Sequence, residues 1–176
     1  MRENPKISKH KNIYLSLGSN IGDRYSNLRE AVSRLKKSGA LEICAVSPVY
    51  ETEPLYNSDQ KKFLNSVIES MTIGSPEDLL AVCMQIEREM KREALSEKNG
   101  PRIIDIDIVF FDDTVMQTEN LTIPHESYSE RKFVLVPLCD LAPGFTCPVS
   151  GDPVSEILVR CADNSLVHRY ESVEAA

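Results

Sequence analysis

The order of strand and helix patterns along the chain is the feature that most constrains its fold. Two segments predict amphipathic helices, because their apolar residues recur at spacings of three and four. Four segments predict strands, since they are rich in strand-forming residues and are flanked by turn residues. We expect the strands over 12–17, 41–51, 63–73 and 102–111, and the helices over 24–37 and 76–92.

In chain order these elements read β-α-β-β-α-β. This order is typical of the ferredoxin-like sandwich, an α+β fold in which two helices cover one face of an antiparallel sheet. The strands over 41–51 and 63–73 are expected to form an antiparallel hairpin, joined by a long polar loop over 52–62. The remainder is expected to form a C-terminal elaboration, with a short strand over 115–119 and helical pieces over 132–138 and 154–161.

Length, composition and net charge limit the number of domains and the kinds of partner that we expect. A chain of 176 residues, 41% hydrophobic and 27% charged, has the size and composition of one globular domain. We expect residues 1–11 to form a flexible polar tail, 12–165 a single domain and 166–176 a second flexible tail. The net charge of −7 argues against a duplex nucleic-acid partner. The oligomeric state stays open between a monomer and a weak dimer.

The sequence also bears on location and redox state. No apolar run is long enough to span a membrane, and residues 1–11 lack the apolar core of a signal peptide. We therefore expect a cytoplasmic protein with no membrane partner. The cysteines form no CxxC pair, which argues against a zinc site and a disulfide framework. We interpret them as reduced thiols that mostly fill the core: Cys44, Cys83, Cys139, Cys147 and Cys161.

Two aspartates interrupt the apolar strand that follows Gly100-Pro101-Arg102. Because side chains alternate along a strand, Asp105 and Asp107 are expected on one face, with their Cα atoms about 6.5 to 7 Å apart. Two carboxylates on a mostly buried sheet need compensation, which a divalent cation or a polyanion bound through one provides. Oxygen ligands favour Mg²⁺ over Zn²⁺. The alternative is a strand end at which both aspartates are simply solvated.

Three neighbouring features bear on whether the aspartates form a metal site or a solvated strand end. Cations before the aspartates can neutralise a polyphosphate or lie on a solvated helix face. His125 follows a proline-fixed turn, where a histidine can be catalytic or structural. Phe63 and Asn65 share a strand face, where they can stack on a flat ring and bond to its edge. Equally, Phe63 can belong to the core and Asn65 can cap the strand. The cations are Arg88, Lys91, Arg92, Lys98 and Arg102.

Five strings carry a family resemblance between residues 12 and 160. They are Leu17-Gly18-Ser19-Asn20, Ser47-Pro48-Val49-Tyr50-Glu51-Thr52-Glu53-Pro54-Leu55, Phe63-Leu64-Asn65, Gly100-Pro101-Arg102-Ile103-Ile104-Asp105-Ile106-Asp107 and Pro124-His125. In order and spacing they resemble the 6-hydroxymethyl-7,8-dihydropterin pyrophosphokinase family of folate biosynthesis. The resemblance implies a ferredoxin-like pyrophosphokinase catalytic domain over 12–165. Such enzymes transfer the diphosphate of ATP to the pterin hydroxymethyl group and release AMP.

The same resemblance implies roles for individual residues. Asp105 and Asp107 would hold two Mg²⁺ ions that bridge the ATP phosphates, and Arg92 would act with them in catalysis. The pterin ring would lie between Phe63 and Phe133. The pocket would also be formed by Asn65, Thr52, Pro54 and Leu55. The ATP site would be formed by Gln85, Glu87, Arg92, Lys98, Arg102, Ile108, His125 and Arg131.

The chain also departs from the family pattern. Ala94 and Asn99 stand where relatives commonly have an arginine and a tryptophan, and Glu126 stands where some have an aromatic residue. Two other interpretations remain open. A nucleotidyl transferase or cyclase could use the same aspartates and would release pyrophosphate. A non-catalytic binding module would leave both aspartates as a solvated edge.

Overall fold

A single antiparallel sheet forms the centre of the molecule, for which the computed structural model describes residues 10–55, 59–90 and 101–171. Its strands follow the order β5-β1-β4-β3-β8, and β2 also pairs with β4. Each of these pairs is antiparallel. The strands are β1 (Lys11–Ser19), β2 (Glu42–Val46), β3 (Tyr50–Thr52), β4 (Phe63–Thr72), β5 (Asp105–Phe111) and β8 (Val167–Arg169).

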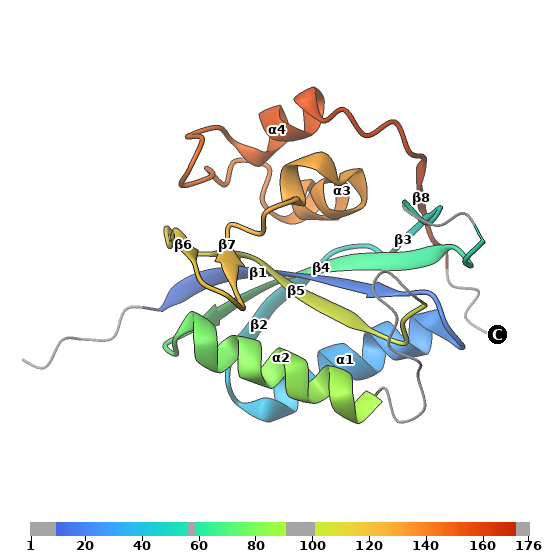
Figure 1. Cartoon of the computed structure of the whole chain (residues 1–176), viewed down its shortest axis with the longest axis horizontal. Helices are drawn as coiled ribbons and strands as arrows, with labels where there is room; N and C mark the ends of the chain where they lie inside the picture. Colours follow the sequence, from blue (N-terminus) through green and yellow to red (C-terminus); the bar gives the residue numbers. More distant parts are fainter. Residues whose placement is uncertain (1–9, 56–58, 91–100, 172–176) are drawn as a thin grey trace, which may run out of the picture.

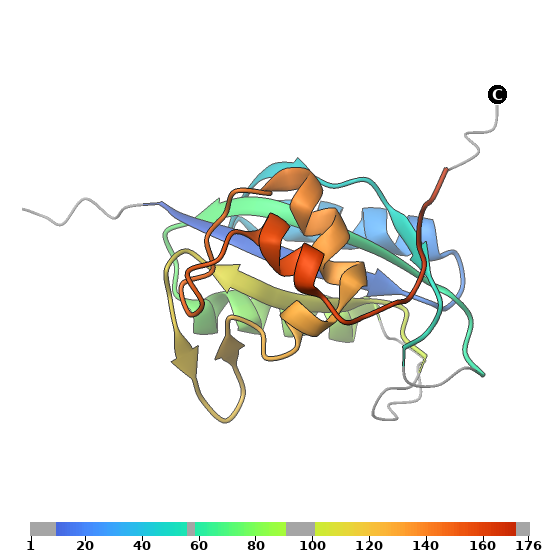
Figure 2. The ribbon, with the colours of Figure 1, turned by 90° about the horizontal axis from the view of Figure 1, so that it is seen from above.

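Helices cover both faces of this sheet (Figure 1). Helices α1 (Arg24–Ser38) and α2 (Pro76–Met90) lie on one face. Helices α3 (Lys132–Leu141) and α4 (Val154–Arg160) lie over the other, where Figure 2 shows them side by side. The link from β5 to α3 contains β6 (Met116–Gln117), β7 (Thr122–Ile123) and the 3-10 helix η1 (Tyr128–Glu130).

Local sequence explains where the two long helices begin and end. Ser75 Oγ accepts a hydrogen bond from the Asp78 N–H at 3.1 Å, so it caps α2 as the sequence predicted. Asp23 Oδ1 accepts from the Ser26 N–H at 3.0 Å at the start of α1. Gly39 ends α1 with φ of +69°, a conformation that glycine adopts without strain.

Alternation along the strands builds a core on each face of the sheet. Ile13, Leu15 and Leu17 of β1 pack with apolar residues of α1 and α2. Tyr14 of β1 and Phe110 of β5 point the other way and pack with residues of α3 and α4. A shift in the β1–β5 register between Tyr14 and Leu15 accommodates one extra residue on β5. Both faces are therefore buried under helices.

The strand predicted over 41–51 is wrong in one respect, because it is broken after Val46. Ser47 Oγ accepts a hydrogen bond from the Val67 N–H at 2.9 Å, and Pro48 has no N–H to donate. A side chain thus replaces a backbone acceptor at this point, and the chain resumes as β3 at Tyr50. Both β2 and β3 pair antiparallel with β4, so the predicted hairpin is confirmed.

The predicted tails also need correction. Lys11 already belongs to β1, and residues 167–169 form β8 rather than part of a flexible tail. Strand β8 pairs with the outer edge of β3, where unpaired backbone groups need partners. The Tyr170 N–H extends this pairing by donating to the Val49 carbonyl at 2.8 Å.

Two further expectations concern the cysteines and the membrane. All five cysteines are free; Cys83 and Cys147 are buried, whereas Cys44 is exposed. Of the helices in the described part of the chain, none is both long and apolar enough to cross a membrane.

Candidate active site

A cavity of about 210 Å³ lies at the end of the sheet where α3 begins. Strands β1, β3, β4 and β5, the segment after β3 and the start of α3 contribute to its wall. The structure brings most of the residues predicted for the site into this one space. Those residues are Thr52, Pro54, Leu55, Phe63, Asn65, Arg102, Asp105, Asp107, His125, Arg131 and Phe133.

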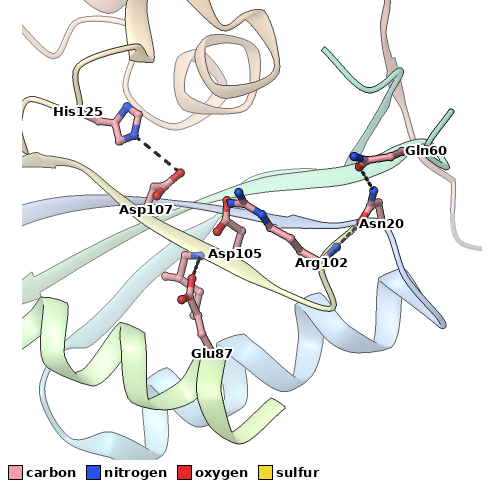
Figure 3. Close-up of polar contacts among 8 residues, drawn as sticks. Asn20, Gln60, Glu87, Arg102, Asp105, Asp107 and His125 are labelled. Atoms are coloured by element: carbon pink, nitrogen blue, oxygen red, sulfur yellow. Dashed lines mark hydrogen bonds and ion pairs between the residues drawn. The ribbon is translucent and has the colours of Figure 1, made fainter. Parts of the chain in front are cut away.

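The two aspartates occupy one face of β5, as strand alternation predicted. Both line the cavity, whereas Ile106 between them is buried in the core beneath α1 and α2. Arg102 Nη1 donates to Asp105 Oδ2 at 2.5 Å. His125 Nε2 lies 3.9 Å from Asp107 Oδ2 and points toward it (Figure 3). Each carboxylate therefore has a nitrogen-bearing side chain on its cavity side.

These partners do not fully offset the concentration of negative charge. Burial raises the pKa of Asp107, and the nearby Asp105 carboxylate raises it further. His125, Arg131 and Arg102 act in the opposite direction without cancelling the rise. An additional cation beside the two carboxylates would offset this charge.

The donor set indicates which cation fits. Among the described residues no group of three or more His, Cys, Asp or Glu side chains is arranged to hold a metal. Mg²⁺ commonly binds through one or two carboxylates and takes its other ligands from water and substrate phosphates. Asp105 and Asp107 supply such a pair of hard oxygen ligands. They could hold Mg²⁺ together with a phosphate-bearing ligand.

The other half of the cavity suits a flat ring with a polar edge. Phe63 and Phe133 both line it, and they come from β4 and α3. Asn65 is 2% exposed, and its Nδ2 donates to Thr52 Oγ1 at 2.9 Å. This bond fixes the amide orientation and leaves the Asn65 carbonyl oxygen and one N–H for other partners.

Gly18 of β1 separates the ring pocket from the aspartates. It pairs with Asn65 on one side and with Asp105 on the other. Two strand spacings therefore place Asn65 and Asp105 about 10 Å apart across the sheet. A Cβ on Gly18 would lie only 3.2 Å from Asn65 Oδ1, so the absence of a side chain keeps the amide accessible.

Asn20 joins the two halves of the cavity wall, although it was named in the sequence only within a family string. It is 2% exposed, and its Oδ1 accepts from the Arg102 N–H at 2.7 Å. Its Nδ2 donates to Gln60 Oε1 at 2.9 Å (Figure 3). Gln60 lines the cavity, and sequence reasoning missed it because nothing local marks a loop glutamine as a site residue.

Three predicted residues lie outside the cavity wall. Ile108 is 3% exposed and belongs to the core on the α1 and α2 face, and its contact with ATP stays a prediction. Gln85 is exposed on α2 and donates to Glu89 at 2.9 Å. Glu87 of α2 accepts a hydrogen bond from the Ile106 N–H at 2.8 Å, so it holds β5 between the two aspartates (Figure 3).

Some predicted features fall outside the described residues. Arg92 and Lys98 were assigned to the nucleotide, and Ala94 and Asn99 were noted as departures; all four belong to residues 91–100. Their roles stay predictions.

Residues 14–143 match the protein family described as 7,8-dihydro-6-hydroxymethylpterin-pyrophosphokinase (HPPK). The chain belongs to this family. The match includes the cavity residues from Ser16 to Phe133. It ends before α4 and β8, so the C-terminal part of this HPPK chain lies beyond it.

Named relatives differ in length. The folic acid synthesis protein fol1 of Schizosaccharomyces pombe is 47% identical over 151 residues, which are 86% of this chain and 20% of that protein. The 2-amino-4-hydroxy-6-hydroxymethyldihydropteridine pyrophosphokinase of Methylorubrum extorquens is 39% identical over 158 residues, 90% of this chain and 98% of that protein. The chain thus spans about a fifth of the first relative and nearly all of the second.

Solved structures share the HPPK fold. The crystal structure of wild-type Plasmodium falciparum HPPK-DHPS with pteroate is similar with a TM-score of 0.67 and 20% sequence identity. The similarity covers 86% of this chain and 42% of that one. At this identity the likeness concerns the fold, a mixed arrangement of helices on an antiparallel sheet.

Proposed function

We propose that the chain transfers the diphosphate of ATP to the hydroxymethyl group of 6-hydroxymethyl-7,8-dihydropterin, a step in folate biosynthesis. The products are AMP and the pterin diphosphate. One observation carries this proposal: a single cavity joins a carboxylate pair suited to Mg²⁺ and nucleotide phosphates with a pocket suited to a flat, polar-edged ring. Family membership supports the same assignment.

The proposed fold assignment is the ferredoxin-like arrangement. The support comes from the order β1, α1, β2 with β3, β4, α2 and β5, together with the antiparallel pairing of β1 with both β4 and β5. In this arrangement α3, α4 and β8 are additions to the repeated β-α-β unit.

In the nucleotide half, Asp105 and Asp107 are proposed to hold two Mg²⁺ ions. Bound there, the metal would neutralise the phosphate charge and orient the diphosphate for attack. Arg102, His125 and Arg131 face the same space and would bind phosphate oxygens. Arg92 and Lys98 are proposed to add cations, with Arg92 acting in catalysis. The remaining proposed ATP contacts are Gln85, Glu87 and Ile108.

In the pterin half, Phe63 and Phe133 would stack on the two faces of the ring. The fixed amide of Asn65 would pair with the donor and acceptor groups of the ring edge, because its orientation is held by Thr52. Pro54 and Leu55 would close the pocket on the loop side. Ordering these groups before binding reduces the cost of holding the pterin in position.

The transfer needs no protein nucleophile. The pterin hydroxyl oxygen would attack the β-phosphorus of ATP and give up its proton, which ends in solvent. The bond from that phosphorus to the oxygen bridging the α-phosphate would break. The β- and γ-phosphates thus move together, and AMP leaves. The work of the protein is to align the hydroxyl with the β-phosphorus and to exclude water.

Identification of the nucleotide product tests the proposal. We expect wild-type protein given ATP, Mg²⁺ and the pterin to form AMP, with the rate dependent on all three. Asp107→Ala should lose nearly all of this activity, because the metal loses one of its two carboxylates. Asp113→Ala, which removes an exposed carboxylate from the turn after β5, is the matched control and should keep it. Pyrophosphate as the product would instead indicate nucleotidyl transfer.

Location and assembly also stay proposals. We propose a cytoplasmic enzyme that acts as a monomer or weak dimer on small-molecule substrates.

A further inference from the structure

The segment that follows α4 reaches both walls of the ring pocket. It leaves α4, passes α3 and ends on the edge of β3 (Figures 1 and 2). This segment lies beyond the family match, which ends at residue 143. None of residues 161–171 lines the cavity, so any influence of these residues on the pocket acts through the elements they hold.

The first wall is the beginning of α3. Asp163 Oδ2 accepts a hydrogen bond from the Lys132 N–H at 2.8 Å. Lys132 is the first residue of α3 and stands between Arg131 and Phe133, both of which line the cavity. The residue at the N-cap position, Arg131, makes no side-chain cap bond. Asp163 therefore caps α3 from a distance of 31 residues along the chain.

The charge state of Asp163 suits this role. Burial alone would raise the pKa of this carboxyl, but hydrogen bonds from Ser165 and Lys132 outweigh burial and hold the pKa below its usual range. Its Oδ1 accepts from the Ser165 N–H at 2.8 Å. Asp163 thus stays ionised at neutral pH, and an anion at the start of a helix is favoured by the helix dipole.

The second wall is β3. Val167 of β8 pairs with Thr52, the residue whose hydroxyl orients Asn65. Thr52 pairs on its other side with Phe63. Strand β3 has only three residues, and its pairing with β8 gives its outer edge the backbone partners that it would otherwise lack. One short segment therefore holds Phe133 through α3 and Phe63 through β3.

We propose that Asp163 is a positioning residue for pterin binding: it fixes the first turn of α3 so that Phe133 faces Phe63, while β8 fixes the opposite wall. This inference rests on the proposed function. It predicts a stronger effect on pterin than on ATP, because the polar partners given for Asp105, Asp107 and Arg102 among the described residues lie outside this segment. Loss of Asp163 should weaken pterin binding more than MgATP binding, because, of the proposed phosphate-binding residues, Arg131 adjoins this cap whereas Arg102 and His125 come from other parts of the chain.

The test compares Asp163→Ala, Asp163→Asn and the control Asp152→Ala. Asp152 pairs with Arg160 at 2.7 Å in the same C-terminal region and does not line the cavity. We expect Asp163→Ala to raise the KM for pterin about 5- to 10-fold, the effect of one lost cap. The kcat at saturating pterin should stay within about twofold of wild type, and the KM for ATP should rise less than the KM for pterin. Asp163→Asn should fall between, because its amide oxygen can still accept from Lys132.

Two further measurements test the positioning role if Asp163→Ala folds poorly. The Tyr170 N–H bonds to the Val49 carbonyl, and every second residue pair along two antiparallel strands is hydrogen-bonded, so Glu51 and His168 form the next bonded pair. Proline has no N–H, so His168→Pro removes a backbone hydrogen bond between β8 and β3. It should also raise the pterin KM selectively. Hydrogen exchange of the ligand-free Asp163→Asn protein should be faster at residues 132–135 and unchanged in α1.

The outcomes separate this inference from the proposed function. If wild type forms no AMP from ATP and pterin, the proposed function fails and the pterin-positioning role fails with it. If wild type is active, the inference fails alone when the Asp163 variants keep the wild-type pterin KM, or when the KM for ATP rises as much as the KM for pterin. A lower melting temperature with unchanged pterin KM shows a purely structural role and also overturns it.

Discussion

Replacing Gly18 by alanine tests the ring pocket with a single carbon atom. The new Cβ would lie 3.2 Å from Asn65 Oδ1 and 3.8 Å from Phe63 Cδ1. The first distance is tighter than ordinary packing, so the amide must shift by roughly a few tenths of an ångström. Asn65 is buried and bonded to Thr52, which leaves it little freedom to move.

We expect a small change in folding stability and a large change in pterin binding. Alanine reduces the freedom of the unfolded chain by about 0.4 to 1 kcal/mol relative to glycine, and this offsets overpacking of about 1 kcal/mol. One misaligned hydrogen bond to the bound pterin costs about 1 to 2 kcal/mol. The dissociation constant should therefore rise about 5- to 30-fold.

Calorimetric titration of pterin into protein saturated with Mg²⁺ and a non-hydrolysable ATP analogue measures this change. Chemical denaturation of the same samples measures stability. Gly144→Ala is the matched control, because its Cβ would meet no atom within 4 Å and it does not line the cavity. Wild-type pterin affinity in Gly18→Ala would refute the placement of Asn65 at the pterin edge.

Three further variants test the surroundings of the site. Asp107→Asn should stabilise the ligand-free protein, because the amide carries no charge to be desolvated or to repel Asp105. The raised pKa means that the native state holds a proton more tightly than the unfolded state, so wild-type stability falls as pH rises through that pKa. The melting-temperature advantage of the variant should therefore shrink at low pH, and a constant difference would contradict this origin. Ser47→Ala should lower the free energy of unfolding in urea by about 1 to 2 kcal/mol, since the Val67 N–H loses its acceptor; an unchanged value would show that the strand break does not depend on the hydroxyl. Asn20→Ala should cost about 1 to 3 kcal/mol in the same assay, because the Arg102 N–H loses its acceptor, and a cost near zero would count against its bridging role.

The parts of the fold that the sequence predicted well depend on local physics. The cap at Ser75 and the shared face of Asp105 and Asp107 follow from short-range geometry, and both appear in the structure. The same alternation rule also predicts that Ile108 faces away from the aspartates, and its side chain lies in the core.

The parts that the sequence did not predict depend on contacts between distant segments. The break after Val46 arises because Ser47 faces Val67 across a strand pair. Strand β8 is too short to show a clear pattern and exists because β3 has an open edge. The bonds of Asn20 to Gln60 and Arg102 likewise join positions 40 and 82 residues away. Such contacts are known only once the strands have been placed side by side.

Phosphorus NMR of a single turnover tests the central claim most directly. With enzyme in excess over ATP and pterin, we predict that the β- and γ-phosphates both appear on the pterin, in equal amount to AMP. In a protein with both Asp105 and Asp107 replaced by alanine, the ATP resonances should persist. Transfer of the γ-phosphate alone, release of free pyrophosphate, or wild-type transfer by the double variant would contradict diphosphate transfer at this carboxylate pair.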